Sequence, residues 1–236
     1  MLEIGCGGGI STHHLLKNNS ISVSIDENPS MINYASDYLK SKNHKVETIK
    51  RAKLIFNNPT YKIEYSEVQV ENKNKTLLIE GDFLTDKKLI NWLYRQDKFD
   101  AIICWFIGVH GVMVANETHR NQYDYLQHNP TIYRMNLHRE LFIKSSKLLK
   151  ADGIVSIIDR TQFFKNDLEK SSALEYVKSY YQLENYGFEV VYMDQKEIDN
   201  PAKIKGVPVK KINNIHVVNV EPEDRFALTS IICMKK

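Results

Sequence analysis

The stretch that most constrains this chain is its first twelve residues, MLEIGCGGGIST. An apolar run containing one acid ends on a cluster of glycines, and a helix-like segment follows, with Ser11 or Thr12 as its predicted cap. This order predicts a strand that runs into a tight turn at the N-terminus of a helix. Glycines suit such a turn because a side chain would block close approach to the backbone, and because the turn often requires positive φ.

Two known glycine patterns can be compared with this turn. The dinucleotide-binding pattern G-x-G-x-x-G/A requires a small third residue, but counting from Gly5 the chain has Ile10 at that position. A dehydrogenase is therefore disfavoured. The pattern E-x-G-x-G-x-G is instead met in full, by Glu3, Gly5, Gly7 and Gly9.

This second pattern resembles the first motif of the class I S-adenosylmethionine (SAM)-dependent methyltransferases. The resemblance implies a Rossmann-like fold, SAM as the cofactor, and cofactor contacts at Glu3, Gly5, Cys6, Gly7 and Gly9. SAM carries a cationic amine and a sulfonium but no pyrophosphate, so an acid beside the turn is electrostatically favourable. The alternative is a strand, turn and helix whose glycines serve geometry alone.

A pair of acids follows the predicted second strand. Residues 21–25 alternate apolar and polar side chains, and Asp26 and Glu27 come next. An acid about 20 residues past the glycine turn can accept hydrogen bonds from both ribose hydroxyls of a nucleotide. Asp26 matches this position, with Glu27 beside it, and a surface acid is the alternative. Asn28 and Pro29 then predict the start of a helix.

A Gly-Asp turn follows the predicted third strand, in the run 77–83. It resembles the adenine-binding turn of the same family. The resemblance implies that Asp82 accepts a hydrogen bond from the adenine amino group, and that Phe83 offers its backbone N–H and ring edge. A plain turn is the alternative. Thr85 is the predicted cap of the next helix.

The run 99–106 is almost entirely apolar, as expected of a buried parallel strand. It resembles the family's fourth strand, whose carboxyl end lies beside the transferred methyl group. This rim holds Cys104, Ile107-Gly108 and His110. Cys104 is a predicted cofactor contact. His110 is a candidate general base, because an unperturbed pKa near 6.5 suits that task, and a structural or solvated histidine is the alternative.

The order of predicted elements indicates one domain, residues 1–236. We predict a doubly wound, mostly parallel α/β sheet of seven strands, with helices on both faces and a C-terminal antiparallel strand. Two stretches interrupt this order and are predicted insertions, at 43–75 and at 196–224. The first is predicted to be a hairpin arm whose second strand merges into 76–79. Methyltransferases of this kind normally carry a cap segment before the first strand, and here the sequence starts inside that strand.

The composition is ordinary for a globular protein, with 26% charged and 42% hydrophobic residues. A formal charge of +3 is too small to indicate nucleic-acid or membrane binding by itself. No apolar run approaches the roughly 20 residues of a membrane span. The three cysteines are far apart in the sequence, which favours reduced thiols in a cytoplasmic protein over a disulfide framework.

The predicted function is SAM-dependent methyl transfer to an oxygen or nitrogen nucleophile of a small molecule. The chain lacks the Asn/Asp-Pro-Pro-Tyr/Phe motif of base amine methylation, a paired-cysteine motif and a metal-binding acidic constellation. An RNA or protein methyltransferase is the first alternative, because residues 45–53 are basic and the predicted arm is rich in tyrosine. A SAM-binding, non-catalytic partner subunit is the second. Arg160, after the predicted fifth strand, is a candidate partner of an anionic substrate or of a surface ion pair.

Overall fold

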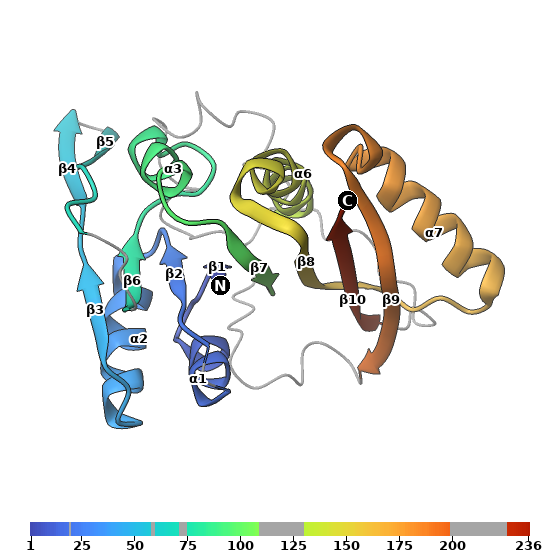
Figure 1. The fold of residues 1–236 in the computed structure, drawn as a ribbon, viewed down its shortest axis with the longest axis horizontal. Coiled ribbons are helices and arrows are strands. Elements are labelled where there is room, and N and C mark those ends of the chain that lie inside the picture. The colour runs from blue at the N-terminus through green and yellow to red at the C-terminus, as the bar shows by residue number, and fades with distance from the viewer. Residues whose placement is uncertain (19, 58–59, 71–74, 109–129, 199–225) are drawn as a thin grey trace.

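The computed structural model describes residues 1–18, 20–57, 60–70, 75–108, 130–198 and 226–236. They form an α/β fold built on one eight-stranded sheet, with helices on both of its faces (Figure 1). The strands lie across the sheet in the order β3-β6-β2-β1-β7-β8-β10-β9. Their bounds are β1 Leu2–Ile4, β2 Val23–Asp26, β3 Val46–Ile49, β6 Thr76–Glu80, β7 Phe99–Trp105, β8 Leu149–Gln162, β9 Phe188–Ile198 and β10 Phe226–Lys235.

The sheet is parallel over most of its width and antiparallel at its C-terminal edge. β1 pairs in parallel with β2 on one side and with β7 on the other, so the order of the strands reverses at β1. β10 pairs antiparallel with both β8 and β9. This arrangement confirms the predicted doubly wound, mostly parallel sheet with a C-terminal antiparallel strand.

The sheet has one strand more than the seven predicted. The additional strand is β3, which pairs in parallel with β6 at the edge of the sheet. It comes from the basic start of the segment 43–75, which was predicted to form only a hairpin arm. Short edge strands with charged side chains are common because they discourage pairing with other chains. A four-residue edge strand carries too little alternation to be recognised from the sequence.

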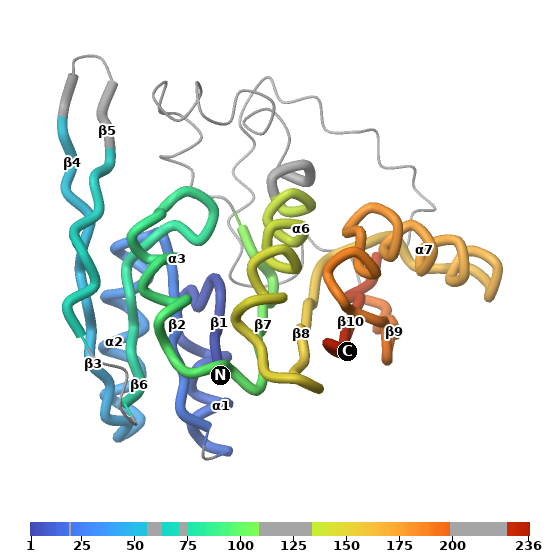
Figure 2. The backbone as a smooth tube through the Cα atoms, turned by 45° about the horizontal axis from the view of Figure 1, so that its top comes forward, coloured from blue at the N-terminus to red at the C-terminus, as the bar shows by residue number. Residues whose placement is uncertain are grey.

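The hairpin in the segment 43–75 pairs different strands from those predicted. β4, Ala52–Asn57, pairs antiparallel with β5, Thr60–Tyr65, in a separate two-stranded sheet. The predicted partner, residues 76–79, belongs to β6 of the main sheet. Figure 2 shows β4 and β5 projecting past the end of β6. The segment does contain a hairpin, but the predicted strand pairing was wrong, because alternation alone does not specify which run is the partner.

Arg51 joins the hairpin to the sheet through a buried network. Its Nη1 lies 2.6 Å from Oδ2 of Asp86, and the two side chains are 1% and 2% exposed. Its Nε and Nη2 donate to the carbonyl of Ser66 at 3.0 and 2.6 Å. The backbone N–H of Arg51 donates to the carboxylate of Glu80 at 2.6 Å. Because a buried charge without partners is costly, this network determines where the hairpin leaves the sheet.

The described residues contain five α-helices and a short 3₁₀-helix. Their bounds are α1 Ile10–Lys17, α2 Pro29–Ser41, α3 Lys87–Tyr94, α6 Pro130–Leu148, α7 Asp167–Tyr180 and the 3₁₀-helix η1 Glu184–Tyr186. α2 begins as predicted, since the side chain of Asn28 accepts a hydrogen bond from the N–H of Ser30 at 3.0 Å. None of these described helices is long and apolar enough to cross a membrane.

The predicted cap of α1 is wrong. The helix begins after Gly9, which adopts φ +81° and makes no side-chain cap hydrogen bond. Ser11 and Thr12 lie inside the first turn, and their hydroxyls donate to the carboxylate of Glu3. A buried acid on the preceding strand therefore uses the hydroxyls that the local pattern assigned to capping.

The predicted cap of α3 is wrong for a similar reason. The helix begins after Asp86, whose carboxylate accepts a hydrogen bond from the N–H of Leu89 at 3.0 Å. The hydroxyl of Thr85 donates instead to the carboxylate of Asp82. Asp86 thus caps α3 and pairs with Arg51 at the same time.

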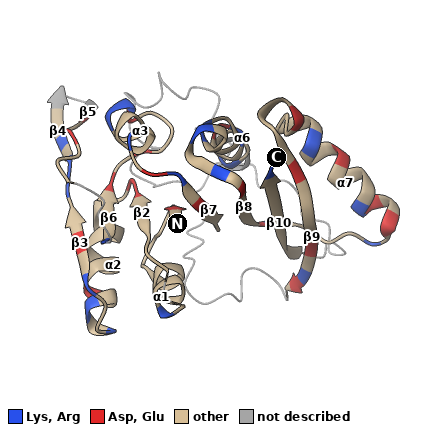
Figure 3. Cartoon of the chain, viewed as in Figure 1, with Lys and Arg blue, Asp and Glu red and all other residues tan. Residues whose placement is uncertain are grey.

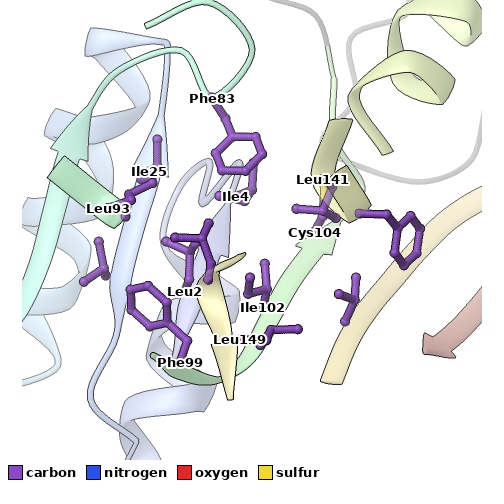
Figure 4. Close-up of a cluster of buried hydrophobic side chains, with 14 of the residues drawn as sticks. Leu2, Ile4, Ile25, Phe83, Leu93, Phe99, Ile102, Cys104, Leu141 and Leu149 are labelled. Carbon is purple, nitrogen blue, oxygen red and sulfur yellow. The ribbon is translucent and has the colours of Figure 1, made fainter. Parts of the chain in front are cut away.

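Two hydrophobic clusters place the helices on opposite faces of the sheet. The larger cluster joins β1, β2, β6, β7 and β8 to α3 and α6. Figure 4 shows members from β1, β2, β7, β8, α3 and α6. Val177 and Tyr180 of α7 pack against this cluster. The smaller cluster lies on the other face, where α2 covers the sheet. Its buried members are Cys6, Ile32, Ala35, Leu39 and Leu78. The helices therefore cover both faces, as predicted.

A buried histidine in α6 makes the stability of this fold sensitive to acid. His138 is 2% exposed, and its Nδ1 lies 3.3 Å from the hydroxyl of Tyr181. Burial lowers the pKa of His138 to about 3, and nearby Arg134 acts in the same direction. An unfolded histidine has a pKa near 6.5, so below that pH the unfolded chain binds the proton and the folded chain does not.

We therefore expect His138 alone to reduce the free energy of unfolding by about 2 kcal/mol between pH 7 and pH 5. Urea denaturation at both pH values checks this, with His138→Phe as the comparison. The variant should lose less stability on acidification than the unmodified chain. Equal losses in the two proteins would contradict the assignment.

Candidate functional site

A pocket lies at the carboxyl ends of β1, β2, β6 and β7, where the order of the strands reverses. Open α/β sheets bind their ligands at this position. The residues that the structure describes enclose about 210 Å³. Small-molecule sites typically measure roughly 300–1,000 Å³, so a cofactor of the size of SAM would extend beyond the enclosed part.

Six of the ten residues predicted at the cofactor line this pocket. They come from three segments that are far apart in the sequence and that neighbouring parallel strands bring together. The six are Gly5, Gly7, Asp26, Glu27, Asp82 and Phe83.

The glycine turn has the backbone geometry that the sequence indicated. Gly5, Gly7 and Gly9 all adopt positive φ, at +77°, +49° and +81°. The N–H groups of Gly5 and Cys6 donate to the carbonyl of Ile25 at 2.8 and 3.1 Å, which ties the turn to β2. A Cβ on Gly7 would meet no atom within 4 Å, so the backbone there borders open space. Such a turn lets a ligand approach the N-terminus of α1.

Gly9 does not line the pocket and packs against α2. A Cβ built on it would lie 3.1 Å from both Cα and Cβ of Ala35 in α2.

We expect Gly9→Ala to reduce the free energy of unfolding by about 2 kcal/mol, because alanine is strained at positive φ and would separate the two helices. Urea denaturation measures this. Gly108→Ala, where a Cβ would meet no atom within 4 Å, is the control and should change stability little. Similar losses in the two variants would argue against the packing role.

Glu3 lies beneath the turn and does not line the pocket. The residue is 2% exposed, and its carboxylate accepts hydrogen bonds from the hydroxyl of Thr12 at 2.6 Å and of Ser24 at 2.7 Å. The hydroxyl of Ser11 donates to the same carboxylate. These bonds join β1 to the first turn of α1 and to β2. The acid of the motif therefore shapes the turn from below, whereas the sequence analysis predicted a cofactor contact.

Asp26 holds the turn from the side of β2 and also lines the pocket. Its Oδ2 accepts a hydrogen bond from the N–H of Gly7 at 2.8 Å, and its Oδ1 accepts one from Asn28 at 2.9 Å. Glu27 lines the pocket next to it. A carboxylate oxygen can accept more than one hydrogen bond, so contact of Asp26 with a ribose stays a prediction compatible with this geometry.

Asp82 and Phe83 form the opposite wall. Asp82 is 3% exposed, and its carboxylate accepts a hydrogen bond from the N–H of Leu84 at 2.8 Å and another from the hydroxyl of Thr85. The ring of Phe83 has the ammonium of Lys144 5.2 Å from its centre. Both residues line the pocket in the order expected of an adenine-binding turn, and the contact with adenine stays a prediction.

The described residues that line the pocket carry charges of one sign only. Three acids line it, Asp26, Glu27 and Asp82. Among the described lining residues there is no lysine, arginine or histidine. Such a wall favours a ligand that is cationic or rich in hydroxyl donors over one that carries several negative charges.

The residues directly after β7 form one wall of the pocket, and the sequence identified only some of them. Ile107 and Gly108 line the pocket, as their place at the rim suggested. Phe106 also lines it, with φ +56° and 45% of its surface exposed. Ile107 crosses the turn so closely that a Cβ on Gly5 would lie 2.2 Å from its Cδ1. Left-handed aromatic residues are uncommon and often occur at functional sites.

Two contributors to the pocket carry no clear signal in the sequence. The φ of Phe106 cannot be inferred from an apolar run. Leu137 lies on α6, far along the chain from the glycine turn, and only the packing of α6 on the sheet places it in the pocket.

Both predicted cysteine contacts lie outside the pocket. Cys6 is buried against α2 on one face of the sheet, and burial raises its pKa well above the ordinary value. Cys104 is fully buried on the other face, and burial raises its pKa as well. Both thiols therefore stay protonated at neutral pH. His110, the candidate base, lies outside the described residues.

Comparisons with known proteins bear on the fold. No protein-family model and no curated protein matches the chain. Among solved structures, a candidate sarcosine dimethylglycine methyltransferase from Galdieria sulphuraria has a TM-score of 0.52 at 11% identity, over 100% of this chain and 77% of its own. A candidate methyltransferase from Bacillus halodurans has a TM-score of 0.47 at 12% identity, over 100% and 91%.

At 11% identity, the similarity to the Galdieria protein shows a shared fold and nothing finer. The chain therefore has the Rossmann-like fold found in SAM-dependent methyltransferases.

Proposed function

We propose that this chain is an enzyme that transfers a methyl group from SAM to an oxygen or nitrogen atom of a small molecule. Three features support the proposal. They are the fold, the complete E-x-G-x-G-x-G turn after β1, and the position of the pocket at the reversal of the strand order.

The strongest support for the proposal is the acidic wall of the pocket, which Asp26, Glu27 and Asp82 form. A dinucleotide would place its pyrophosphate at the N-terminus of α1, near three acids and with no basic side chain among the described lining residues. SAM instead brings a sulfonium and an ammonium group, which such a wall attracts. Both ligands offer a ribose and an adenine, so the charge of the remaining part distinguishes them.

Each segment of the pocket has a proposed task. Asp26 and Glu27 would accept hydrogen bonds from the ribose hydroxyls. Asp82 and Phe83 would hold the adenine. The open backbone at Gly7, beside the N-terminus of α1, would receive the carboxylate of the methionine part.

The methyl group of bound SAM is already activated by the positive sulfur, so the protein contributes mainly position and exclusion of water. A lone pair of the acceptor oxygen or nitrogen forms the new bond to the methyl carbon. SAM would supply the methyl group and leave as S-adenosylhomocysteine, with the electron pair of the carbon–sulfur bond on sulfur, and the acceptor proton would pass to water or to a base.

Calorimetric titration with S-adenosylhomocysteine, the product form of the cofactor, and separately with NAD tests the proposal. We expect one micromolar site for S-adenosylhomocysteine and no measurable binding of NAD. Binding of NAD alone would overturn the proposal, and so would binding of neither ligand to the folded chain.

A small-molecule acceptor is preferred to RNA on the evidence of charge. Figure 3 shows lysine and arginine interspersed with aspartate and glutamate, for example along α7. The hairpin β4–β5 is the feature that favours a macromolecule, because it projects past the sheet and carries exposed Lys53 and Leu54 (Figure 2). RNA binding whose affinity falls steeply with salt would favour this second candidate.

A further inference from the structure

A second cavity lies between α6 and α7, over β8 and β10. Its volume is about 790 Å³, within the roughly 300–1,000 Å³ of typical small-molecule sites. It shares no lining residue with the pocket at the glycine turn. Figure 1 shows both helices toward the β8–β9 end of the sheet, away from α1 and α2.

The cavity walls are largely apolar and aromatic. Ile157 and Ile231 contribute from neighbouring positions of β8 and β10. Rings come from Phe164, Tyr176 and Tyr181. Such walls suit a flat, ring-shaped ligand, because aromatic rings pack favourably against one another.

A buried polar atom beside the cavity has no partner. His138 lines the cavity and is 2% exposed. Its Nδ1 lies 3.3 Å from the hydroxyl of Tyr181, whereas its Nε2 has no hydrogen-bond partner in the structure. Buried polar atoms in native proteins nearly always have one.

The described charged residues that line the cavity, three cations and two acids, carry one net positive charge. Nε of Arg134 lies 3.2 Å from Oδ2 of Asp159, so these two charges balance. Burial raises the pKa of Asp159, and Arg134 opposes that shift. Among the described residues, Arg160 and Lys165 line the cavity and form no ion pair, while Glu169 is the remaining acid. The balance favours an anionic group on the ligand.

The cavity and the glycine-turn pocket are neighbours at the carboxyl ends of β7 and β8. α6 separates them, because Leu137 lines the pocket and the next residue, His138, lines the cavity. The N–H of Phe106, a pocket residue, donates to the carbonyl of Ile158 at 2.8 Å, and Asp159 beyond it lines the cavity. β7 and β8 are neighbouring strands, about 4.8 Å apart, so residues of the two sites are adjacent across this edge.

We propose that the cavity between α6 and α7 binds the methyl acceptor, and that this acceptor is an aromatic carboxylate. The proposal rests on the proposed function. The rings would pack against the body of the acceptor, and Arg160 and Lys165 would attract its carboxylate. Its nucleophilic atom would extend over the ends of β7 and β8 toward the methyl group.

Calorimetric titration with 2-naphthoate tests the site, with neutral 2-naphthamide as the comparison of the same shape. Ala173 lines the cavity, and Ser171 on the same helix is exposed and does not. We expect one 2-naphthoate site that Ala173→Trp abolishes and Ser171→Trp leaves intact. Arg160→Gln combined with Lys165→Gln should weaken 2-naphthoate about tenfold and leave 2-naphthamide unchanged.

The outcomes separate this proposal from the proposed function. S-adenosylhomocysteine should bind all variants equally, which also shows that they are folded. If S-adenosylhomocysteine binds and 2-naphthoate does not, or if Ala173→Trp leaves 2-naphthoate binding intact, the cavity proposal fails alone. If S-adenosylhomocysteine does not bind the unmodified chain, the proposed function fails, and the acceptor role of the cavity fails with it.

A separate measurement tests whether a ligand in the cavity lies close to the cofactor, as a methyl acceptor must. Magnetisation transfer between bound 2-naphthoate and bound S-adenosylhomocysteine, measured by NMR in the ternary complex, reports protons within about 5 Å of each other. We expect such transfer in the unmodified chain. Two bound ligands without any transfer would overturn the acceptor role.

Discussion

Replacing Asp26 by alanine should weaken binding of S-adenosylhomocysteine by at least about 100-fold. In the proposed function the carboxylate accepts two ribose hydroxyls, and hydrogen bonds to charged groups contribute about 1.5–3 kcal/mol each. The change also removes the acceptor of the Gly7 N–H, which lies 2.8 Å from Oδ2. Both changes weaken the binding of S-adenosylhomocysteine, and calorimetric titration of the variant measures the combined loss of affinity.

Two further variants show whether this loss is specific. Asp37→Ala removes an exposed acid on α2 and should leave the affinity unchanged. Asp26→Asn keeps an acceptor for the Gly7 N–H but removes the charge. Its affinity for S-adenosylhomocysteine should therefore lie between those of the unmodified chain and Asp26→Ala. Full affinity in a folded Asp26→Ala protein would mean that Asp26 serves the turn alone and that the ribose binds elsewhere.

The second large effect should come from the buried ion pair between the hairpin and the sheet. We expect Asp86→Asn to reduce the free energy of unfolding by about 3 kcal/mol, because the Arg51 guanidinium would stay buried without its counter-charge. Asparagine can still cap α3, so the change isolates the loss of charge from the loss of the cap. Urea denaturation measures the free energy.

A surface pair supplies the control. Lys150 and Asp100 lie 2.5 Å apart but are 54% and 73% exposed, so Asp100→Asn should cost less than about 1 kcal/mol. Hydrogen exchange adds a local readout, since amides of β5 should exchange faster in Asp86→Asn. The interpretation of Arg51 as an anchor would be wrong if the two variants lost equal stability.

The sequence predicted the main lines of the fold because those lines depend on local patterns. Glycines at fixed spacing after an apolar run identified the turn, and their positive φ angles confirm the geometry. Apolar alternation and the run 99–106 identified β2 and β7. Acids directly after β2 and β6 then had to lie near one another, because the carboxyl ends of parallel strands meet at one edge.

The roles of individual polar side chains could not be predicted, because they depend on partners far along the chain. Glu3 matches the motif by position, yet three hydroxyls hold its carboxylate below the turn. Thr85 has the composition of a cap, but its hydroxyl donates to Asp82, and Asp86 caps the helix instead. A local pattern reports which residue could cap, and only packing decides which carboxylate is close enough.

What the sequence determined by itself is the order of the elements and the turn that begins the site. Short-range geometry decides both, since glycine spacing and apolar periodicity act over a few residues. What only the tertiary structure decided is the added edge strand β3, the burial of Arg51 against Asp86, and the cavity between α6 and α7. Each of these joins segments many residues apart, and the free energy that selects them comes from burial and charge pairing in the folded chain.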